Sequence, residues 1–115
     1  MTDRDPDCLF CKIVAREIPA RKVYEDDHSV AFEDLNPQAP THVLVVPREH
    51  YTDVADLGRS PAQAGRFLAG ISGVVDQLGL KHFRTVFNTG TEVGQSVFHV
   101  HAHVLSGRPM DWPPG

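Results

Sequence analysis

The chain has 115 residues, which is room for one domain (1–115) with a buried core of its own. Its apolar and charged fractions, 41% and 23%, are those of an ordinary globular protein and exclude a disordered tail or a fibre. The formal net charge of −4 argues against the basic face that a nucleic-acid polymer needs. The polar start and the lack of a long apolar run predict no export signal, no membrane span and a cytoplasmic location.

Apolar patterning predicts four elements in the first half of the chain. A short helix is expected over Leu9–Arg16. Strands are expected over Lys22–Glu25 and Val30–Asp34, and the three residues between them are few enough for a hairpin. A third strand is expected over His42–Val46, which contains the longest aliphatic run of the chain.

The clearest element is a long helix after residue 60. Ser60 is a cap residue, Pro61 suits the first helical position, and Gly79 is a stop signal. Between them, apolar residues recur at steps of three and four and form one stripe: Ala64, Phe67, Leu68, Ile71, Val74, Val75 and Leu78. This stripe predicts a helix that packs on a sheet.

Two more strands are expected, over Phe83–Asn88 and Val97–Leu105. The resulting order, three strands, a helix and two strands, does not suit a doubly wound parallel sheet. It predicts an α+β domain in which helices cover one face of a five-stranded, mostly antiparallel sheet.

The last predicted strand carries three alternating histidines, His99, His101 and His103. Alternate residues of a strand share a face, so the imidazoles are expected on one side at intervals of about 6.6 Å. Burying neutral imidazoles without partners is costly, so this face is expected to line a site. A solvated polar face and a metal centre made of all three histidines are the alternatives.

The segment HVHAHVL, residues 99–105, resembles the signature of the histidine triad (HIT) family of nucleotide hydrolases and transferases. The segments FEDLNPQAPTH (32–42) and PREH (47–50) resemble the first half of that family. The closing GRPMDWPPG (107–115) resembles its HINT branch of purine nucleoside phosphoramidases. The resemblance covers nearly the whole chain after Cys8.

The resemblance implies a HIT-like fold and a covalent mechanism. His101 would be the nucleophile that attacks the phosphorus of an adenosine (purine) 5′-monophosphate conjugate, and water would then release AMP. The main-chain carbonyl of His99 would fix the tautomer of His101. His103 and His42 would face the phosphate, and Ser96 would lie near the leaving group. The group that protonates a leaving amine stays open.

The resemblance also implies nucleoside contacts. Asp34 would bind the ribose hydroxyls, and the base would lie among Leu9, Phe10, Ile13, Phe32 and Leu35. Some of these five apolar residues are equally expected in an ordinary core. Further nucleotide contacts would come from the loop of residues 89–94 and from Asn88, Gln95, Ser96, His101 and His103. That loop carries no P-loop pattern, so no magnesium–triphosphate chemistry is expected.

Cys8 and Cys11 have the C-x-x-C spacing of a metal site or a redox dithiol. No β-α-β pattern adjoins them, which disfavours the redox interpretation; two ordinary buried cysteines are a third possibility. Some bacterial relatives carry a structural zinc whose ligands match Cys8, Cys11, His50 and His99. We therefore expect a structural Zn²⁺ with no open position, and no cofactor for catalysis.

The resemblance further implies a homodimer whose two five-stranded sheets join into ten strands. A diadenosine polyphosphate hydrolase and a nucleotide-binding regulatory module with vestigial activity are the alternatives to a phosphoramidase. A zinc deaminase is excluded, because its H-x-E and P-C-x-x-C patterns are missing.

Overall fold

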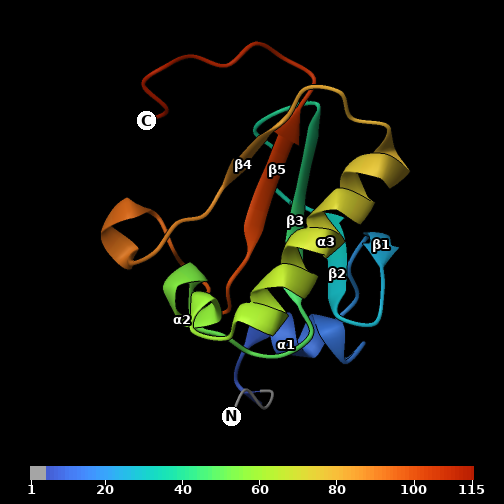
Figure 1. Ribbon diagram of the computed structural model, residues 1–115, viewed down its shortest axis with the longest axis vertical. Helices are drawn as coiled ribbons and strands as arrows, with labels where there is room; N and C mark the ends of the chain where they lie inside the picture. Colours follow the sequence, from blue (N-terminus) through green and yellow to red (C-terminus); the bar gives the residue numbers. More distant parts are fainter. Residues whose placement is uncertain (1–4) are drawn as a thin grey trace.

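The computed structural model describes residues 5–115. Its elements follow one another in the order α1 (Leu9–Val14), β1 (Lys22–Glu25), β2 (Ser29–Glu33), β3 (Thr41–Pro47), α2 (Val54–Gly58), α3 (Pro61–Leu78), β4 (Arg84–Val86), a 3₁₀ turn (Thr91–Val93) and β5 (Ala102–Ser106). The five strands form one sheet in the order β1-β2-β3-β5-β4, and every neighbouring pair is antiparallel (Figure 1). The predicted α+β class with a five-stranded antiparallel sheet and a long helix is confirmed.

The long helix α3 packs on one face of the sheet. Its buried side chains Phe67, Ile71 and Val74 belong to a core cluster that also holds Val43 and Val45 of β3. The helix ends as predicted at Gly79, whose φ of 65° is the left-handed conformation that glycine adopts without a Cβ penalty. Ser60 precedes the helix but makes no side-chain capping bond. The stripe prediction is wrong for Leu68, which is 59% exposed.

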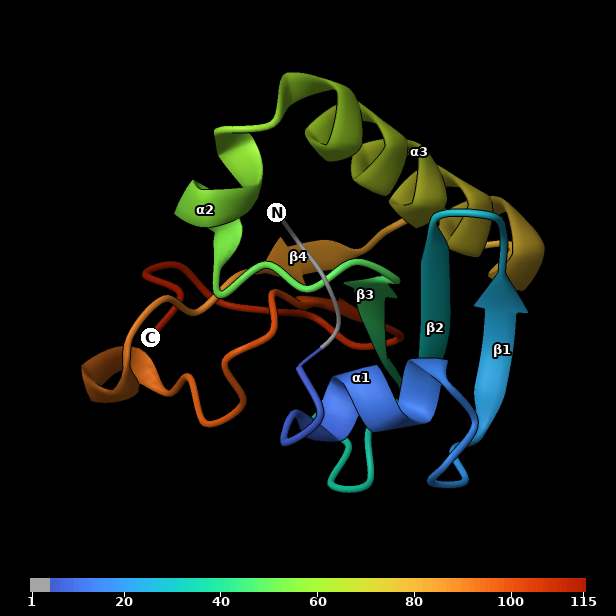
Figure 2. The same ribbon diagram turned by 90° about the horizontal axis from the view of Figure 1, so that it is seen from below.

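The short helix α1 lies on the opposite face of the sheet from α3 (Figure 2). Its residues Phe10 and Ile13 pack with Leu44 and Val46, two β3 residues on the face away from α3. The prediction that the helices share one face is therefore wrong. The unbroken aliphatic run in β3 is the signal of a strand covered on both sides.

The strand β5 is shorter than predicted, because it begins at Ala102 and leaves His99 and His101 in the irregular segment before it. In the register of β3 with β5, Val45 pairs with Ala102, so Pro47 would come opposite Val100. Proline has no N–H for a ladder bond, and the Val100 N–H bonds instead to the Tyr51 carbonyl. The β3–β5 ladder therefore includes His103 but ends before His101 and His99.

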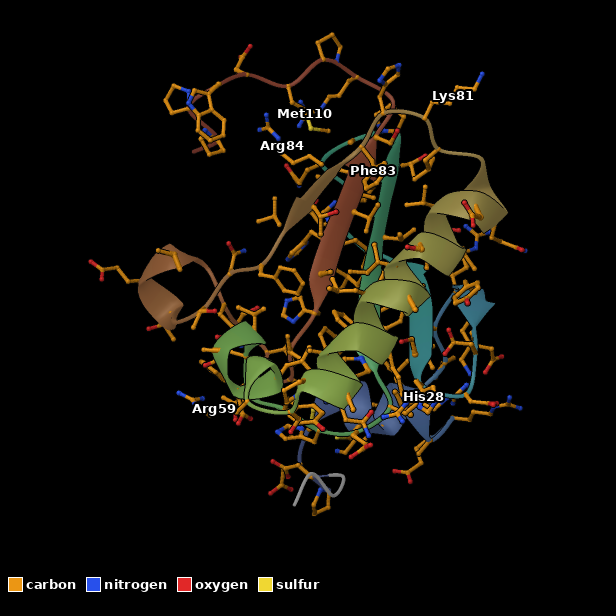
Figure 3. All side chains as sticks on the ribbon, viewed as in Figure 1. His28, Arg59, Lys81, Phe83, Arg84 and Met110 are labelled. Atoms are coloured by element: carbon orange, nitrogen blue, oxygen red, sulfur yellow. The ribbon has the colours of Figure 1, made fainter. Side chains whose placement is uncertain are left out.

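The C-terminal segment crosses the end of the sheet that lies farthest from α1. Phe83, Arg84 and Met110 gather there with Lys81 (Figure 3), around an open cavity of about 780 Å³. None of the predicted site residues lines this cavity. Arg84 holds the segment by donating a hydrogen bond to the carbonyl of Asp111 (2.9 Å). Within residues 5–115, no helix has the length and apolarity to cross a membrane.

Candidate active site and metal centre

Four predicted metal ligands meet where α1 begins. Cys8 is the N-cap of α1 and Cys11 lies one turn later, so the helix brings both sulfurs to one side. His99 Nδ1 lies 3.4 Å from Cys8 Sγ and 3.5 Å from Cys11 Sγ. His50 Nδ1 lies 3.4 Å from Cys11 Sγ and 3.2 Å from His99 Nδ1. All four donor atoms lie within 4.8 Å of one another.

These distances fit a tetrahedral zinc, whose sulfur and nitrogen ligand atoms lie roughly 3.3–3.8 Å apart. The hydrogen bonds around the cluster fit as well. His99 Nε2 bonds to the Pro47 carbonyl (2.9 Å), which places the ring proton there and leaves a lone pair on Nδ1. Each sulfur accepts a backbone N–H, Cys8 Sγ from Cys11 and Cys11 Sγ from Asp5.

The protonation states of the cluster also suit a cation. Burial lowers the pKa of His99 to about 4, so the imidazole is neutral, as a ligand must be. Burial, the largest cause, and the neighbouring Cys8 raise the pKa of the Cys11 thiol to about 11. A divalent cation would compensate the charge of the two thiolates in this buried position. No position is left open for substrate, so the metal would be structural.

The next histidine, His101, is fixed in one tautomer. Its Nδ1 bonds to the main-chain carbonyl of His99 (2.8 Å), and a carbonyl only accepts. The proton therefore lies on Nδ1, and Nε2 keeps its lone pair. Burial lowers the pKa of His101, which keeps the imidazole neutral, and the edge of Phe10 packs against the ring at 5.0 Å between centroids. His101 is thus an oriented neutral imidazole with an unprotonated Nε2.

His103 pairs with His42 of the neighbouring strand β3. In the antiparallel register, Leu44 is the direct partner of His103, and His42 lies diagonally across. His42 Nε2 lies 2.9 Å from His103 Nδ1 and 3.5 Å from Asp34 Oδ2. Burial lowers the pKa of His103 to about 4, and the neighbouring His101 and His42 contribute.

The three histidines of the 99–103 segment thus have separate partners. His99 belongs to the cysteine cluster, His101 to a carbonyl and His103 to His42. This arrangement counts against a single metal ion bound by all three. Asp34, His42 and His103 also lie close enough to surround an ion. His42, however, accepts the Gln38 N–H at Nδ1, so its proton occupies Nε2, where an ion would have to bind.

The residues predicted to contact the nucleoside lie in two environments. Phe10, Ile13 and Phe32 are buried together on the α1 side of the sheet. Leu9 is 44% exposed and Leu35 is fully exposed, so neither packs in that core. Asp34 is half-buried at the end of β2, and one of its oxygens accepts the Asn36 N–H. The base-wall role of these residues stays a prediction.

The loop that precedes the histidines is held by Gln95. Its buried side chain accepts the Gly90 N–H and donates to the carbonyls of Thr52 and Val97. The side-chain amide of Gln95 is thus bonded to backbone groups, and the predicted contact of Gln95 with a nucleotide stays a prediction. Ser96 is exposed and Asn88 is half-buried beside the loop.

A scan against protein-family models matches the HIT domain over residues 15–110. The chain belongs to the HIT domain family. An uncharacterized HIT-like protein of Synechocystis is 50% identical over 111 residues, which is 95% of this chain and 97% of that protein. A 14 kDa zinc-binding protein of Zea mays is 43% identical over 115 residues, which is 96% of this chain and 90% of that protein.

Solved structures give the same family. A HIT family hydrolase from Legionella pneumophila superposes with a TM-score of 0.85 at 42% identity, and the match covers 95% of this chain and 100% of that one. A histidine triad protein from Clostridium difficile superposes with a TM-score of 0.86 at 40% identity, covering 94% and 96%. The Legionella hydrolase supports a hydrolase-like activity for this chain, and the zinc-binding relative is compatible with structural zinc in the Cys₂His₂ cluster.

Three functional contacts were missed from the sequence. The Pro47 carbonyl orients His99, the Gln38 amide orients His42, and the Tyr51 carbonyl takes the N–H of Val100. All three are backbone groups, so no side-chain motif could reveal them. Pro47 gave one signal in the sequence, because proline lacks the N–H that a β-ladder needs and so indicates where pairing stops.

Proposed function

We propose that the protein hydrolyses adenosine (purine) 5′-phosphoramidates, or related AMP conjugates, through a covalent intermediate on His101. The carrying observation is the 2.8 Å bond from His101 Nδ1 to the His99 carbonyl, which leaves Nε2 with a lone pair in a buried site. A nucleophile needs this oriented free nitrogen.

The reaction proceeds in two displacements. In the first, His101 Nε2 forms a bond to the α-phosphorus while the P–N bond breaks, and its electron pair leaves with the amine, which takes up a proton. In the second, water attacks the phosphorus, AMP leaves, and the neutral imidazole is restored. The balance is one phosphoramidate and one water in, one amine and one AMP out. His103, neutral and next to His101, would donate a hydrogen bond to the phosphoryl oxygens, where charge develops.

The test is intact-mass spectrometry after brief exposure to an adenosine 5′-phosphoramidate, with His101→Ala in parallel. We expect AMP release and a nucleotidyl adduct in the wild type, and neither in the variant. Nucleotide binding without AMP release by the wild type would favour a regulatory module. Faster turnover of a diadenosine polyphosphate than of the phosphoramidate would replace the substrate but keep the mechanism.

We also propose a structural Zn²⁺ bound by Cys8, Cys11, His50 and His99. The donor distances and the neutral His99 support it. Metal analysis should give one zinc per chain in the wild type and much less in Cys11→Ser. Equal metal content in both would refute this ligand set.

A cytoplasmic homodimer completes the proposal. The β4 edge of the sheet is paired on one side only, by β5, and is the position at which a second sheet would join. Light scattering at micromolar concentration should give twice the chain mass. A monomeric mass would refute the dimer and leave the chemistry above unaffected.

A further inference from the structure

A directed chain of hydrogen bonds runs from the backbone to His103. The Gln38 N–H donates to His42 Nδ1 (3.0 Å), and His42 Nε2 lies 2.9 Å from His103 Nδ1. A backbone N–H can only donate, so His42 Nδ1 must carry the lone pair. The proton of neutral His42 is then on Nε2 and is donated to His103 Nδ1. His103 in turn keeps its own proton on Nε2.

Gln38, the first donor in this chain of hydrogen bonds, is itself held by other hydrogen bonds. Gln38 lies in the loop between β2 and β3, and Arg108 of the C-terminal segment donates from Nε to its carbonyl (2.9 Å). Its side-chain amide donates to the Asn36 carbonyl, and the Asn36 N–H bonds to Asp34 (2.8 Å). Gln38, whose N–H orients His42, is thus held by its carbonyl and by its side chain.

The competing acceptor for the His42 proton is weaker. Asp34 Oδ2 lies 3.5 Å from His42 Nε2, against 2.9 Å for His103 Nδ1. Hydrogen bonds of N–H donors are typically 2.7–3.2 Å long, so the proton is directed at His103. Burial keeps His103 neutral at pH 7, because its pKa is lowered to about 4. A neutral imidazole has a single N–H, so the tautomer decides which of its two nitrogens can donate a hydrogen bond.

We propose that His42 is a positioning residue which, oriented by the Gln38 amide, holds His103 in the Nε2–H tautomer. His103 then offers a hydrogen-bond donor to the phosphoryl oxygens beside the nucleophile, and this role rests on the hydrolysis proposed above. His101 and His103, with ring centroids 5.1 Å apart, have opposite tautomers. The backbone therefore sets a lone pair on one ring and a donor on its neighbour.

The decisive measurement is the ¹⁵N–¹H correlation spectrum of the histidine side chains at pH 7, which distinguishes Nδ1–H from Nε2–H rings. The His103 signals are assigned by their loss in His103→Gln. We expect Nε2–H for His103 in the wild type and a mixture of tautomers in His42→Leu. In His42→Gln, the terminal amide can still donate to His103 Nδ1, and the Nε2–H form should return. His28→Leu, which changes an exposed histidine in the β1–β2 turn (Figure 3), is the matched control.

Kinetics supply the second readout. Loss of one donor to a developing oxyanion costs about 10²–10³ in kcat, so misorientation of His103 in His42→Leu should lower kcat roughly 10- to 100-fold. KM should change less than about threefold, because the donor acts mainly in the transition state. His42→Gln should recover most of kcat, and His28→Leu should match the wild type.

Two outcomes would overturn the inference. One is an Nδ1–H ring for His103 in the wild type, which needs no variant to fold. The other is an unchanged His103 spectrum in a folded His42→Leu protein. Neither depends on turnover. A wild type with the expected tautomers but no AMP release would refute the proposed function and leave the hydrogen-bond chain standing.

Discussion

The packing of Phe10 makes a quantitative prediction about how α1 is held on the sheet. Phe10 is 5% exposed, and its ring lies edge-on to Phe32 (5.5 Å) and to His101 (5.0 Å). Truncation of a buried phenylalanine to alanine costs about 3–5 kcal/mol, the sum of lost transfer energy and a cavity. The two ring pairs account for about 0.5–1.5 kcal/mol each within that range. Phe10→Ala should therefore lower the free energy of unfolding by about 3–5 kcal/mol.

The neighbouring Leu9 is the matched control, because it lies on the same helix but is 44% exposed. Leu9→Ala should cost less than about 1 kcal/mol, since surface substitutions usually have small effects. Both values are to be measured by urea denaturation. The dependence of the unfolding free energy on urea concentration (the m-value) is fitted as one shared value, so that the midpoint concentration reports stability. A six-residue helix is not stable alone, and its position depends on this packing. Equal losses in Phe10→Ala and Leu9→Ala would refute the reasoning.

Three further predictions concern stability, pH and metal. Gly70→Ala would place a Cβ 2.8 Å from Ser29 Cβ and should destabilise the protein by about 1–2 kcal/mol. In Gly65→Ala the new Cβ meets nothing within 4 Å, and the variant should be more stable than the wild type by about 0.5–1 kcal/mol. Thermal melts of both variants measure these changes. The pKa of His103 is lowered on folding from 6.5 to about 4, so the unfolded chain takes up a proton at a higher pH than the folded chain. The free energy of unfolding should therefore fall as the pH drops from 6.5 towards 4, and it should fall by less in His103→Gln. Equal pH dependence of the unfolding free energy in the two proteins would refute this prediction. Chelation of zinc should lower the melting temperature of the wild type but not of Cys11→Ser, and a shift in both would point to another site.

Local signals predicted the elements well where one residue type decides the backbone. The left-handed stop at Gly79 and the strand Lys22–Glu25 were predicted to the residue. The helix α2 was missed, although Thr52 and Asp53 gave a signal: Asp53 accepts the Asp56 N–H, and Asp56 accepts the Thr52 N–H. This arrangement resembles a capping box, with aspartate in place of glutamate and with the N–H of the residue before the N-cap as the second donor.

The remaining strand limits depend on partners that the sequence does not display. The strand predicted over Phe83–Asn88 shortens to Arg84–Val86, because the register of β4 with β5 pairs only these three residues. The strand Val97–Leu105 was predicted from an alternation that continues through His99, but the ladder stops where Pro47 removes a donor. Alternation fixes which side chains share a face, and only the partner strand decides where pairing ends.

The residues of the site could be predicted from their side-chain types, but the protonation states of the rings could not. The His-x-His-x-His pattern predicts a row of imidazoles, but the position of each ring proton depends on its hydrogen-bond partner. These partners are the Pro47 carbonyl for His99, the His99 carbonyl for His101 and the His42 ring for His103. Three polar groups of His99 have partners: Nδ1 faces the cysteines, Nε2 bonds to the Pro47 carbonyl, and the His99 carbonyl accepts from His101. The Cys₂His₂ cluster and His101 therefore meet at one residue, His99. Because the contact to His101 is made by the main-chain carbonyl of His99, the side-chain contacts of His99 affect the His101 ring by fixing the backbone at residue 99.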